Sequence, residues 1–438
     1  METIAPAGLQ ELEDRLVRAA ASYVWDRSPF YQGKFREAGV KPRHIAGARD
    51  LRRLPFTSKA DLRASQERQP PFGTHTAVPL RDVVRVHKTS GSTGRPLYIA
   101  MTRKDVQNTN ECAARAFWAA GLRPDHLVVH CLNYCLWLGG YTDHSSLEYT
   151  GAAVVPFGVG HSGLLVRTIR DLGVTAISCT PSYMAVLARV VREELGLEPR
   201  DLGLRLGLFG GEPGMAIPGT RRAIEETWGL VARDANYGMS DTLSNFAAEC
   251  DVRPELHFLG QGAILCQLID PESERDREIV AGESGEFVFT TLGREGQPLL
   301  RYRSGDIVMI LATDPCECGR TGFRFRVLGR SDDMLIVKGI NVFPSSVETV
   351  LGEMRPQLTG AFQILLPRPN PLEVLSIRAE HGEAVPSGGL AGLRTGVERR
   401  LRELLSARAE VELVAPNTLP RFEGKAKRIV KLYTGETA

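Results

Sequence analysis

The spacing of apolar and polar residues divides the chain into regions of different secondary structure. Residues 9–38 repeat apolar positions at helical spacing and predict amphipathic helices. From Val83 onward, short β-branched runs alternate with helical patterns. The predicted strands are 83–86, 127–130, 153–155, 176–179 and 204–209, and the helices include 182–194 and 219–228. Because such alternation builds parallel sheets, this region predicts a doubly wound α/β fold.

The pattern changes twice toward the C-terminus. Between Ala263 and Ile310 helical patterns thin out, and strands at 286–290 and 306–310 predict a more antiparallel, β-barrel-like part. Beyond Arg330 the order β, α, β, β, α, β predicts a small α+β domain with elements at 333–337, 345–353, 360–366, 373–379, 390–405 and 410–413. We therefore expect an N-terminal domain of residues 1–329 and a C-terminal domain of residues 330–438.

Composition narrows the class of protein. The 54 basic and 52 acidic residues leave a net charge of +2, which gives no support for a nucleic-acid or acidic-membrane partner. No apolar run approaches the roughly 20 residues that cross a bilayer, and the N-terminus has no signal-peptide pattern. Eight cysteines in 438 residues are too sparse for a disulfide framework, so we expect a reduced, cytoplasmic protein.

The first candidate for chemistry is Thr89-Ser90-Gly91-Ser92-Thr93-Gly94, directly after the strand at 83–86. Glycines let the backbone approach an anion closely, and hydroxyl and N–H groups can then surround phosphate oxygens. The segment is not the common P-loop, because no Lys-Ser or Lys-Thr pair follows Gly94. An ordinary flexible loop is the alternative.

Four further segments accompany this loop along the chain, at 236–241, 301–306, 329–344 and 423–428. Together with 89–94, and in this order, they resemble the core motifs of the adenylate-forming superfamily of acyl-CoA synthetases, peptide-synthetase adenylation domains and luciferases. The sequence of residues 329–344 and the short length of the whole chain resemble the phenylacetate–CoA ligase branch. The resemblance covers about residues 80–438 and implies a large N-terminal domain with a small, mobile C-terminal lid domain.

The resemblance implies a two-step reaction. A carboxylate attacks the α-phosphorus of ATP to give an acyl-adenylate and pyrophosphate, and a thiol then displaces AMP. It implies that Thr89 to Gly94 hold phosphates, that Tyr237 contacts adenine and that Asp306 accepts from the ribose hydroxyls. The other nucleotide contacts would be Gly211, Glu212, Pro213, Asn236, Gly238, Met239, Ser240 and Arg330.

Asp241 stands where the superfamily usually has a glutamate directed at Mg²⁺. Aspartate is one methylene shorter, and a helix-capping role is the alternative. Lys425, after Gly424, is the expected adenylation lysine, because a point charge on a flexible stem can bridge a carboxylate and a phosphate. Lysines near a C-terminus are usually only solvated. The resemblance places the hinge between the two steps at Asp332 and the coenzyme A tunnel at Gly339.

Aromatic and small residues gather where the branch binds its acyl group. The expected pocket residues are Tyr134, Trp137, Tyr141, Ser182, Tyr183 and Gly210. A flat pocket with a glycine wall suits an aryl acid. Most tyrosines and tryptophans, however, simply belong to a protein core, and that alternative stays open.

A metal site is also indicated. Cys316 and Cys318 form a tight pair, and Cys250 with His257 form another. A Cys₃His set is an ordinary structural zinc site, and members of the branch often carry a similar one. Free buried cysteines are the alternative.

We thus expect an enzyme that uses ATP and Mg²⁺ to join an aromatic acid to coenzyme A. The alternative is a stand-alone adenylation enzyme that loads a carrier-protein thiol or another nucleophile. A third hypothesis is a non-catalytic protein that senses AMP. The presence of Lys425 and of the 89–94 loop argues against it. The branch resemblance is compatible with a homodimer, which nothing in the sequence tests.

Overall fold

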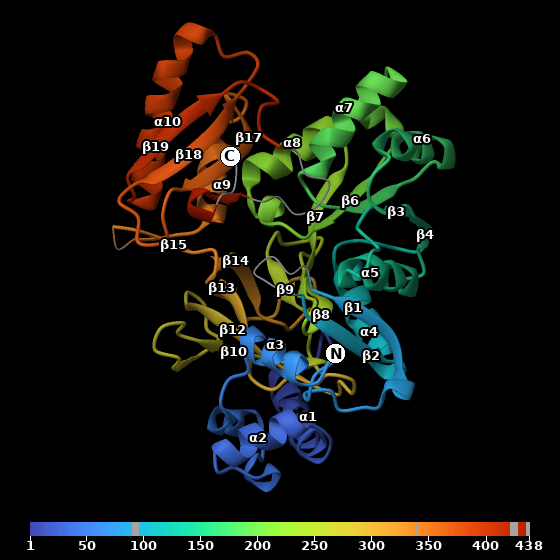
Figure 1. The fold of residues 1–438 in the computed structure, drawn as a ribbon. Helices are drawn as coiled ribbons and strands as arrows, with labels where there is room; N and C mark the ends of the chain where they lie inside the picture. The colour runs from blue at the N-terminus through green and yellow to red at the C-terminus, as the bar shows by residue number, and fades with distance from the viewer. Residues whose placement is uncertain (90–95, 339, 421–427, 435–438) are drawn as a thin grey trace.

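The computed structural model describes residues 1–89, 96–338, 340–420 and 428–434. Figure 1 shows the N-terminal helices at one end, a large central sheet, and the C-terminal residues beside α8 at the other end. The α-helices are α1 (Pro6–Arg27), α2 (Pro29–Glu37), α3 (Lys59–Arg68), α4 (Arg103–Ala119), α5 (Leu138–Tyr149), α6 (Ser162–Leu172), α7 (Tyr183–Leu195), α8 (Pro218–Trp228), α9 (Pro344–Glu353) and α10 (Leu390–Leu405). In the part of the chain described, none of them is long and apolar enough to cross a bilayer.

The central sheet has twelve strands, in the order β11-β10-β12-β13-β14-β9-β8-β7-β6-β5-β3-β4. Its strands are β3 (Leu127–His130), β4 (Ala153–Pro156), β5 (Ala176–Cys179), β6 (Leu206–Gly210), β7 (Val231–Met239), β8 (Leu243–Ala248), β9 (Leu256–Phe258), β10 (Ile264–Ile269), β11 (Asp276–Arg277), β12 (Ser284–Thr291), β13 (Tyr302–Ala312) and β14 (Arg324–Arg330). A separate hairpin joins β1 (Val83–Lys88) to β2 (Tyr98–Thr102).

Strands β4, β3, β5, β6 and β7, in their order across the sheet, are parallel and covered by helices on both faces. Helices α6, α7 and α8 pack on one face around Val129, Ile177 and Phe209, and α4 and α5 pack on the other around Val128 and Leu208. This arrangement confirms the doubly wound fold, because residues that alternate along each strand bury against opposite helix layers.

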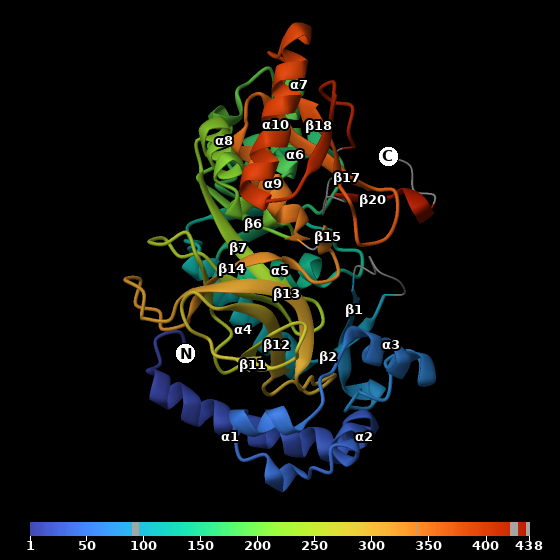
Figure 2. The ribbon, with the colours of Figure 1, turned by 90° about the vertical axis from the view of Figure 1, so that its left-hand side faces the viewer.

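The remaining strands are antiparallel and continue the same sheet. β7 pairs in parallel with β6 but antiparallel with β8, so it joins the two halves that the sequence pattern separates. Figure 2 shows the antiparallel half strongly curved over the N-terminal helices. Tyr31 and Phe35 of α2 pack there against Leu265, Leu292 and Leu300. The antiparallel, barrel-like part predicted between Ala263 and Ile310 therefore corresponds to this curved half of the sheet.

Residues after Arg330 form a second α+β unit with its own apolar core. A four-stranded sheet in the order β19-β18-β17-β20 carries α9 and α10 on it, and a short hairpin precedes it. Its strands are β15 (Leu335–Val337), β16 (Ile340–Val342), β17 (Leu358–Leu366), β18 (Leu375–His381), β19 (Ala409–Val414) and β20 (Ile429–Lys431). The predicted element order is found, with the short β16 and β20 added, which are too brief to show a pattern. The boundary at residue 329 stays a prediction.

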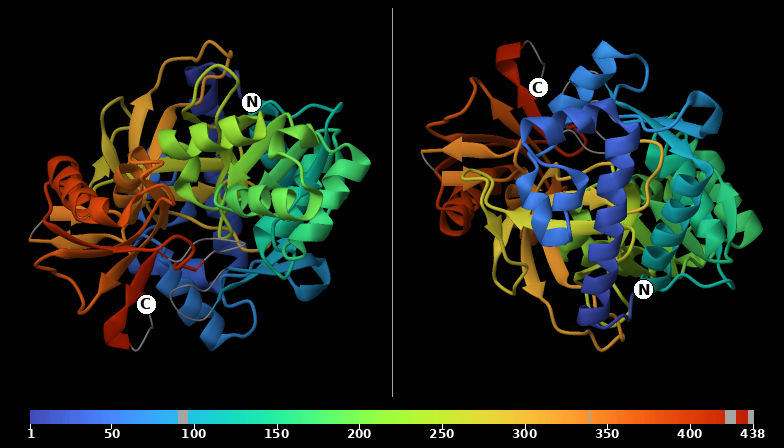
Figure 3. Two further views of the ribbon diagram at one scale, coloured as in Figure 1. Left: turned by 90° about the horizontal axis from the view of Figure 1, so that it is seen from above. Right: turned by 90° about the horizontal axis from the view of Figure 1, so that it is seen from below.

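The C-terminal unit packs on the parallel half through α8 and α9. A Cβ placed on Gly219 would lie 2.4 Å from the carbonyl oxygen of Gly352, so only glycine allows this approach. Figure 3, in its view from above, shows the C-terminal sheet beside the helices of the parallel half.

Candidate active site

A cavity of about 430 Å³ lies between the ends of the parallel strands, the antiparallel strands β13 and β14, and α9. Ligands of open α/β sheets bind at this edge, outside the carboxyl ends of the strands. The cavity collects eight of the residues predicted to bind nucleotide, from four separate segments: Gly211, Glu212, Asn236, Tyr237, Gly238, Met239, Asp306 and Arg330. Ser240 follows directly after β7, and nothing is described of the Pro213 side chain.

Tyr237, Asp306 and Arg330 form one hydrogen-bonded group on the cavity wall. The Tyr237 hydroxyl donates to Asp306 Oδ2 at 2.9 Å, and Arg330 Nη1 donates to Asp306 Oδ1 at 2.9 Å. Asp306 and Arg330 stand opposite each other on β13 and β14. Burial and the charge of Asp306 raise the pKa of Tyr237, so the phenol keeps its proton and remains a donor. The group presents a fixed carboxylate to the cavity.

Arg330 also reaches the predicted hinge. Its Nε donates to Asp332 Oδ1 at 2.8 Å, directly after β14. Burial lowers the pKa of Arg330, but the negative charges of Asp306 and Asp332 outweigh this effect, so the pKa is raised overall. The arginine therefore links the predicted ribose carboxylate to the predicted hinge residue.

Asn236 lines the cavity with its amide held from behind. Its Nδ2 donates to Asp143 Oδ2, and the Ser244 hydroxyl donates to Asp143 Oδ1 at 2.6 Å. Burial raises the pKa of Asp143 to about 7, and these two donors oppose the shift. Asp143 and Ser244 were not anticipated from the sequence, since buried polar partners leave no pattern in it.

Asp241 follows β7 in a buried position, 8% exposed. Its Oδ2 lies 3.5 Å from Lys59 Nζ, while its Oδ1 has no hydrogen-bond partner among the described residues. A buried carboxylate oxygen without a donor suits a bound cation. Lys59 was not predicted. It begins α3, whose first turn is capped by Ser58, and this position directs its side chain to Asp241.

The predicted acyl residues lie in three different surroundings. The Tyr134 hydroxyl forms a 3.0 Å hydrogen bond with His144 Nδ1, and Trp137 packs on Gly139. Tyr141 is 47% exposed, and the Arg85 guanidinium lies over its ring. Tyr183 instead lies in the core formed with α6, 1% exposed, with its hydroxyl 2.8 Å from Ser162 Oγ. For Tyr183 the structure therefore supports the core alternative.

Ser182 and Gly210 lie beside the nucleotide residues. The Ser182 amide donates to Glu212 Oε1 at 2.6 Å. A Cβ on Gly210 would lie 2.5 Å from Asn236 Cβ, so β6 and β7 approach closely here only because residue 210 is glycine. These two residues help to position Glu212 and Asn236.

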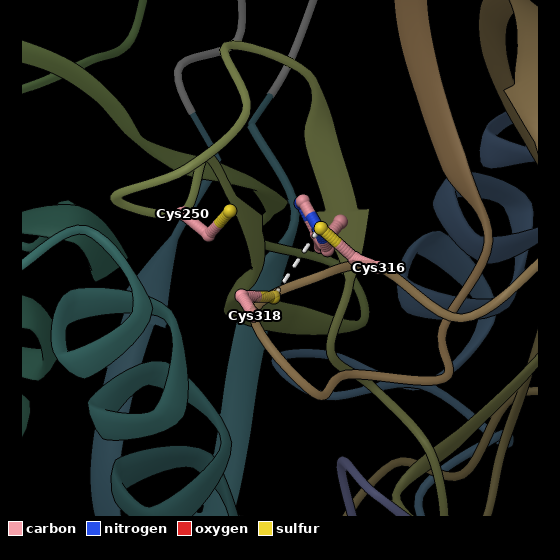
Figure 4. A group of neighbouring side chains, drawn as sticks. Cys250, Cys316 and Cys318 are labelled. Carbon is pink, nitrogen blue, oxygen red and sulfur yellow. Dashed lines mark hydrogen bonds between the residues drawn. The ribbon is translucent and has the colours of Figure 1, made fainter.

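Cys250, His257, Cys316 and Cys318 come together, with their ligand atoms all within 4.8 Å of one another. Figure 4 shows the three cysteine side chains directed toward a common centre, with a dashed line for the 3.7 Å contact between Cys318 Sγ and His257 Nε2. His257 Nδ1 lies 3.0 Å from the carbonyl oxygen of Glu255, and burial lowers the pKa of His257 to about 4. The ring is thus neutral, and donation from Nδ1 leaves Nε2 free to bind a metal.

The backbone also prepares this cluster for a metal. The amides of Val252 and Arg253 donate to Cys250 Sγ at 3.4 and 3.2 Å. Such donors stabilise a thiolate. The donor set and its polar surroundings fit Zn²⁺.

Other predicted residues fall outside the described part of the chain: Ser90, Gly91, Ser92, Thr93, Gly94, Gly339 and Lys425. Thr89 is described and buried, and its Oγ1 accepts from the Leu97 amide at 3.0 Å. Arg428, three residues after Lys425, lines the cavity and donates to Glu348 Oε1 at 2.7 Å.

Residues 7–292 match the AMP-binding enzyme family, and residues 339–432 match the AMP-binding enzyme C-terminal domain. The chain belongs to the AMP-binding enzymes. Within this family it is 35% identical to the phenylacetate–coenzyme A ligase of Thermus thermophilus, over 99% of this chain and 98% of that protein. It is 32% identical to the Escherichia coli phenylacetate–coenzyme A ligase, with 99% and 97% covered. The chain is thus an AMP-forming acid–CoA ligase of the phenylacetate–CoA ligase branch.

Solved structures agree with this family assignment. The chain matches 2-hydroxyisobutyryl-CoA ligase in its postadenylation state with a TM-score of 0.91 at 33% identity, covering 98% of this chain and 91% of that one. Against the same ligase in the thioesterification state, over the same shares of the two chains, the TM-score is 0.72. This AMP-binding enzyme therefore has its two parts arranged as in the postadenylation state.

Proposed function

We propose that this ligase activates an aromatic carboxylic acid with ATP and transfers the acyl group to coenzyme A, releasing AMP and pyrophosphate. The observation that carries the proposal is the hydrogen-bonded group of Tyr237, Asp306 and Arg330 on the wall of the cavity. A fixed carboxylate can accept from two neighbouring ribose hydroxyls at once.

The first step is assigned to the following residues. Asp306 orients the nucleotide through its ribose, Tyr237 lies against the adenine, and the 89–94 loop surrounds the outer phosphates. Asp241 would hold Mg²⁺, which neutralises phosphate charge when bound. Lys425 would stabilise the charge that develops as the acid's oxygen attacks the α-phosphorus and pyrophosphate leaves.

The second step is assigned to a rotation of the residues that follow β14 about Asp332. The Arg330–Asp332 contact at 2.8 Å would then change partners, since it spans the hinge. Gly339 would line the tunnel of the pantetheine arm, and the thiol would attack the acyl carbonyl and displace AMP. The similarity to two conformations of one ligase supports this assignment.

The aromatic class of acid rests on Tyr134, Trp137 and Tyr141 and on the phenylacetate–CoA ligases among the relatives. The 2-hydroxyisobutyryl-CoA ligase structures make a small hydroxy acid the competing substrate. A carrier-protein acceptor, a homodimer and a cytoplasmic location stay predictions.

Pyrophosphate release tests the proposal. The enzyme is incubated with ATP, Mg²⁺ and one acid at a time, from benzoates and phenylacetates to 2-hydroxyisobutyrate, each with and without coenzyme A. We expect coenzyme A-dependent turnover with an aryl acid. Turnover with 2-hydroxyisobutyrate alone would contradict the aromatic class, and pyrophosphate without a coenzyme A thioester would favour the carrier-protein alternative.

We also propose that the Cys₃His cluster holds a structural Zn²⁺. Elemental analysis is expected to find about one zinc per chain, and Cys318→Ser is expected to lose the metal and lower the unfolding temperature by several degrees. Cys135→Ser, at an exposed cysteine outside the cluster, is the control. A metal-free preparation that unfolds at the same temperature as the zinc-loaded protein would contradict the site.

A further inference from the structure

A buried carboxyl group that the proposed reaction does not use lies behind the cavity. Asp143 of α5 is fully buried, and its two oxygens accept from Asn236 Nδ2 and from the Ser244 hydroxyl. Within the described residues, no lysine, arginine or histidine forms an ion pair with Asp143. A buried carboxyl group without a cation is costly, so its presence here needs an explanation.

Asp143 fixes the orientation of the Asn236 amide. Such an amide has two N–H donors on one side and a carbonyl acceptor on the other, and half a turn exchanges them. Because Asp143 Oδ2 accepts from Nδ2, the amide nitrogen is held on Asp143. In the part of the chain described, no group donates to Asn236 Oδ1. Asn236 lines the cavity, so this oxygen is an acceptor that a ligand can use.

This polar group lies where the expected acyl residues meet the nucleotide residues. Asp143 is on α5, the helix that carries Tyr141 and begins directly after Trp137. A Cβ placed on Gly210, the expected glycine wall of the acyl pocket, would lie 3.2 Å from Asn236 Cγ. Asn236 also directly precedes Tyr237 on β7. Asn236 therefore lies where the acid and the nucleotide have to meet.

An acceptor at this place selects for a donor on the acid. An apolar acid would take Asn236 Oδ1 out of water without replacing its hydrogen bond, which costs free energy. A hydroxyl or amino group would donate to Oδ1, and a hydroxyl could also accept from the second N–H of Nδ2. Sites built to hydrogen-bond a substrate O–H or N–H group strongly reject analogues that lack it.

We propose that Asn236, positioned by Asp143, makes this ligase selective for acids that carry a hydroxyl or amino group. The side chain of Asn236, predicted as a nucleotide contact, is thereby assigned to the acid. The proposal rests on the proposed function for the reaction and names a narrower class of substrate for it.

Matched acids test the proposal with the full-length enzyme. Benzoates and phenylacetates that carry a hydroxyl, an amino or a methyl group at the same ring position are compared. So are 2-hydroxyisobutyrate and pivalate, in which a methyl group replaces the hydroxyl. In at least one series, kcat/KM for coenzyme A thioester formation is expected to be at least about tenfold higher for the hydroxyl or amino acid than for the methyl acid. No such preference in any series would overturn the proposal.

Two variants assign the preference to the proposed residues. Asn236→Leu removes both polar atoms at nearly constant size and is expected to lower kcat/KM about tenfold or more for the preferred acid only. Asp143→Ala releases the amide and is expected to reduce the preference, with KM for ATP unchanged. Ser146→Ala is the matched control, because it removes another buried polar group of α5, whose hydroxyl donates to the Thr142 carbonyl oxygen at 2.7 Å. It is expected to keep the preference.

The ratio between the two acids separates this role from a structural one. The group also joins α5 to β7 and β8, so a purely structural role would lower turnover of both acids equally. An equal fall for both acids, or an unchanged preference in Asn236→Leu, would overturn the proposal. Thermal unfolding checks that the variants fold, and for a variant that does not fold the wild-type comparison decides.

The two proposals can fail separately. Aryl-CoA formation without a preference for hydroxyl or amino acids would overturn this proposal and support the proposed function. Turnover of 2-hydroxyisobutyrate, but of neither pivalate nor any aryl acid, would contradict the aromatic class and support the selection for a donor.

Discussion

Lys425→Ala is expected to reduce acyl-adenylate formation by about 100- to 1000-fold, the loss typical of one group that stabilises transition-state charge. Conversion of a supplied acyl-adenylate and coenzyme A into the thioester should remain largely intact. The reason is that, in the proposed mechanism, the lysine acts on the α-phosphate and the second step follows a rotation of the C-terminal part. Single-turnover assays of the two half-reactions measure both effects.

The described residues around Lys425 support its assignment. Arg428 lines the cavity and contacts Glu348 of α9, and three residues of chain reach about 10 Å. Lys427→Ala is the matched control, since it removes a lysine of the same segment that does not follow the glycine. Equal loss of both half-reactions in Lys425→Ala would contradict the assignment of separate conformations to the two steps.

Asp306→Ala is expected to lower kcat/KM for ATP by about 100- to 1000-fold, because hydrogen bonds to a charged group contribute about 1.5–3 kcal/mol each. The carboxylate is 7% exposed and accepts from Tyr237 and Arg330, so its removal also leaves Arg330 without one of its two carboxylates. Steady-state kinetics over a range of ATP concentrations checks the loss, and thermal unfolding checks that the variant folds.

Tyr237→Phe is the graded comparison for Asp306→Ala. It removes one donor to Asp306 and keeps the ring, so a loss of about tenfold is expected. A loss in Asp306→Ala no larger than that of Tyr237→Phe would show that the carboxylate does not bind the ribose.

The sequence pattern predicted the parallel half well because buried parallel strands are continuous apolar runs. It did not show that β7 joins both halves, because that depends on the turn at Met239–Thr242 and on the pairing of Tyr237 with Ala247. Periodicity reports local conformation, whereas the partner of a strand is set by contacts far along the chain.

The candidate site was predicted unevenly for a similar reason. Asp306 and Arg330 lie in motifs, and the structure places them opposite each other. Cys250, His257, Cys316 and Cys318 were predicted as a set from residue type and the branch resemblance, and the structure brings them together, while the metal itself stays a prediction. Lys59 belongs to no motif, and a single charged residue usually signifies only a solvated surface. Tyr183 has the residue type of a pocket but lies in the core.

The most direct test of the central claim is the product ratio with ATP, an aryl acid and coenzyme A all present. Chromatography with mass detection should find aryl-CoA, AMP and pyrophosphate in equal amounts, with no ADP. Release of ADP and phosphate, or AMP without an aryl-CoA thioester for any aromatic acid, would contradict the account.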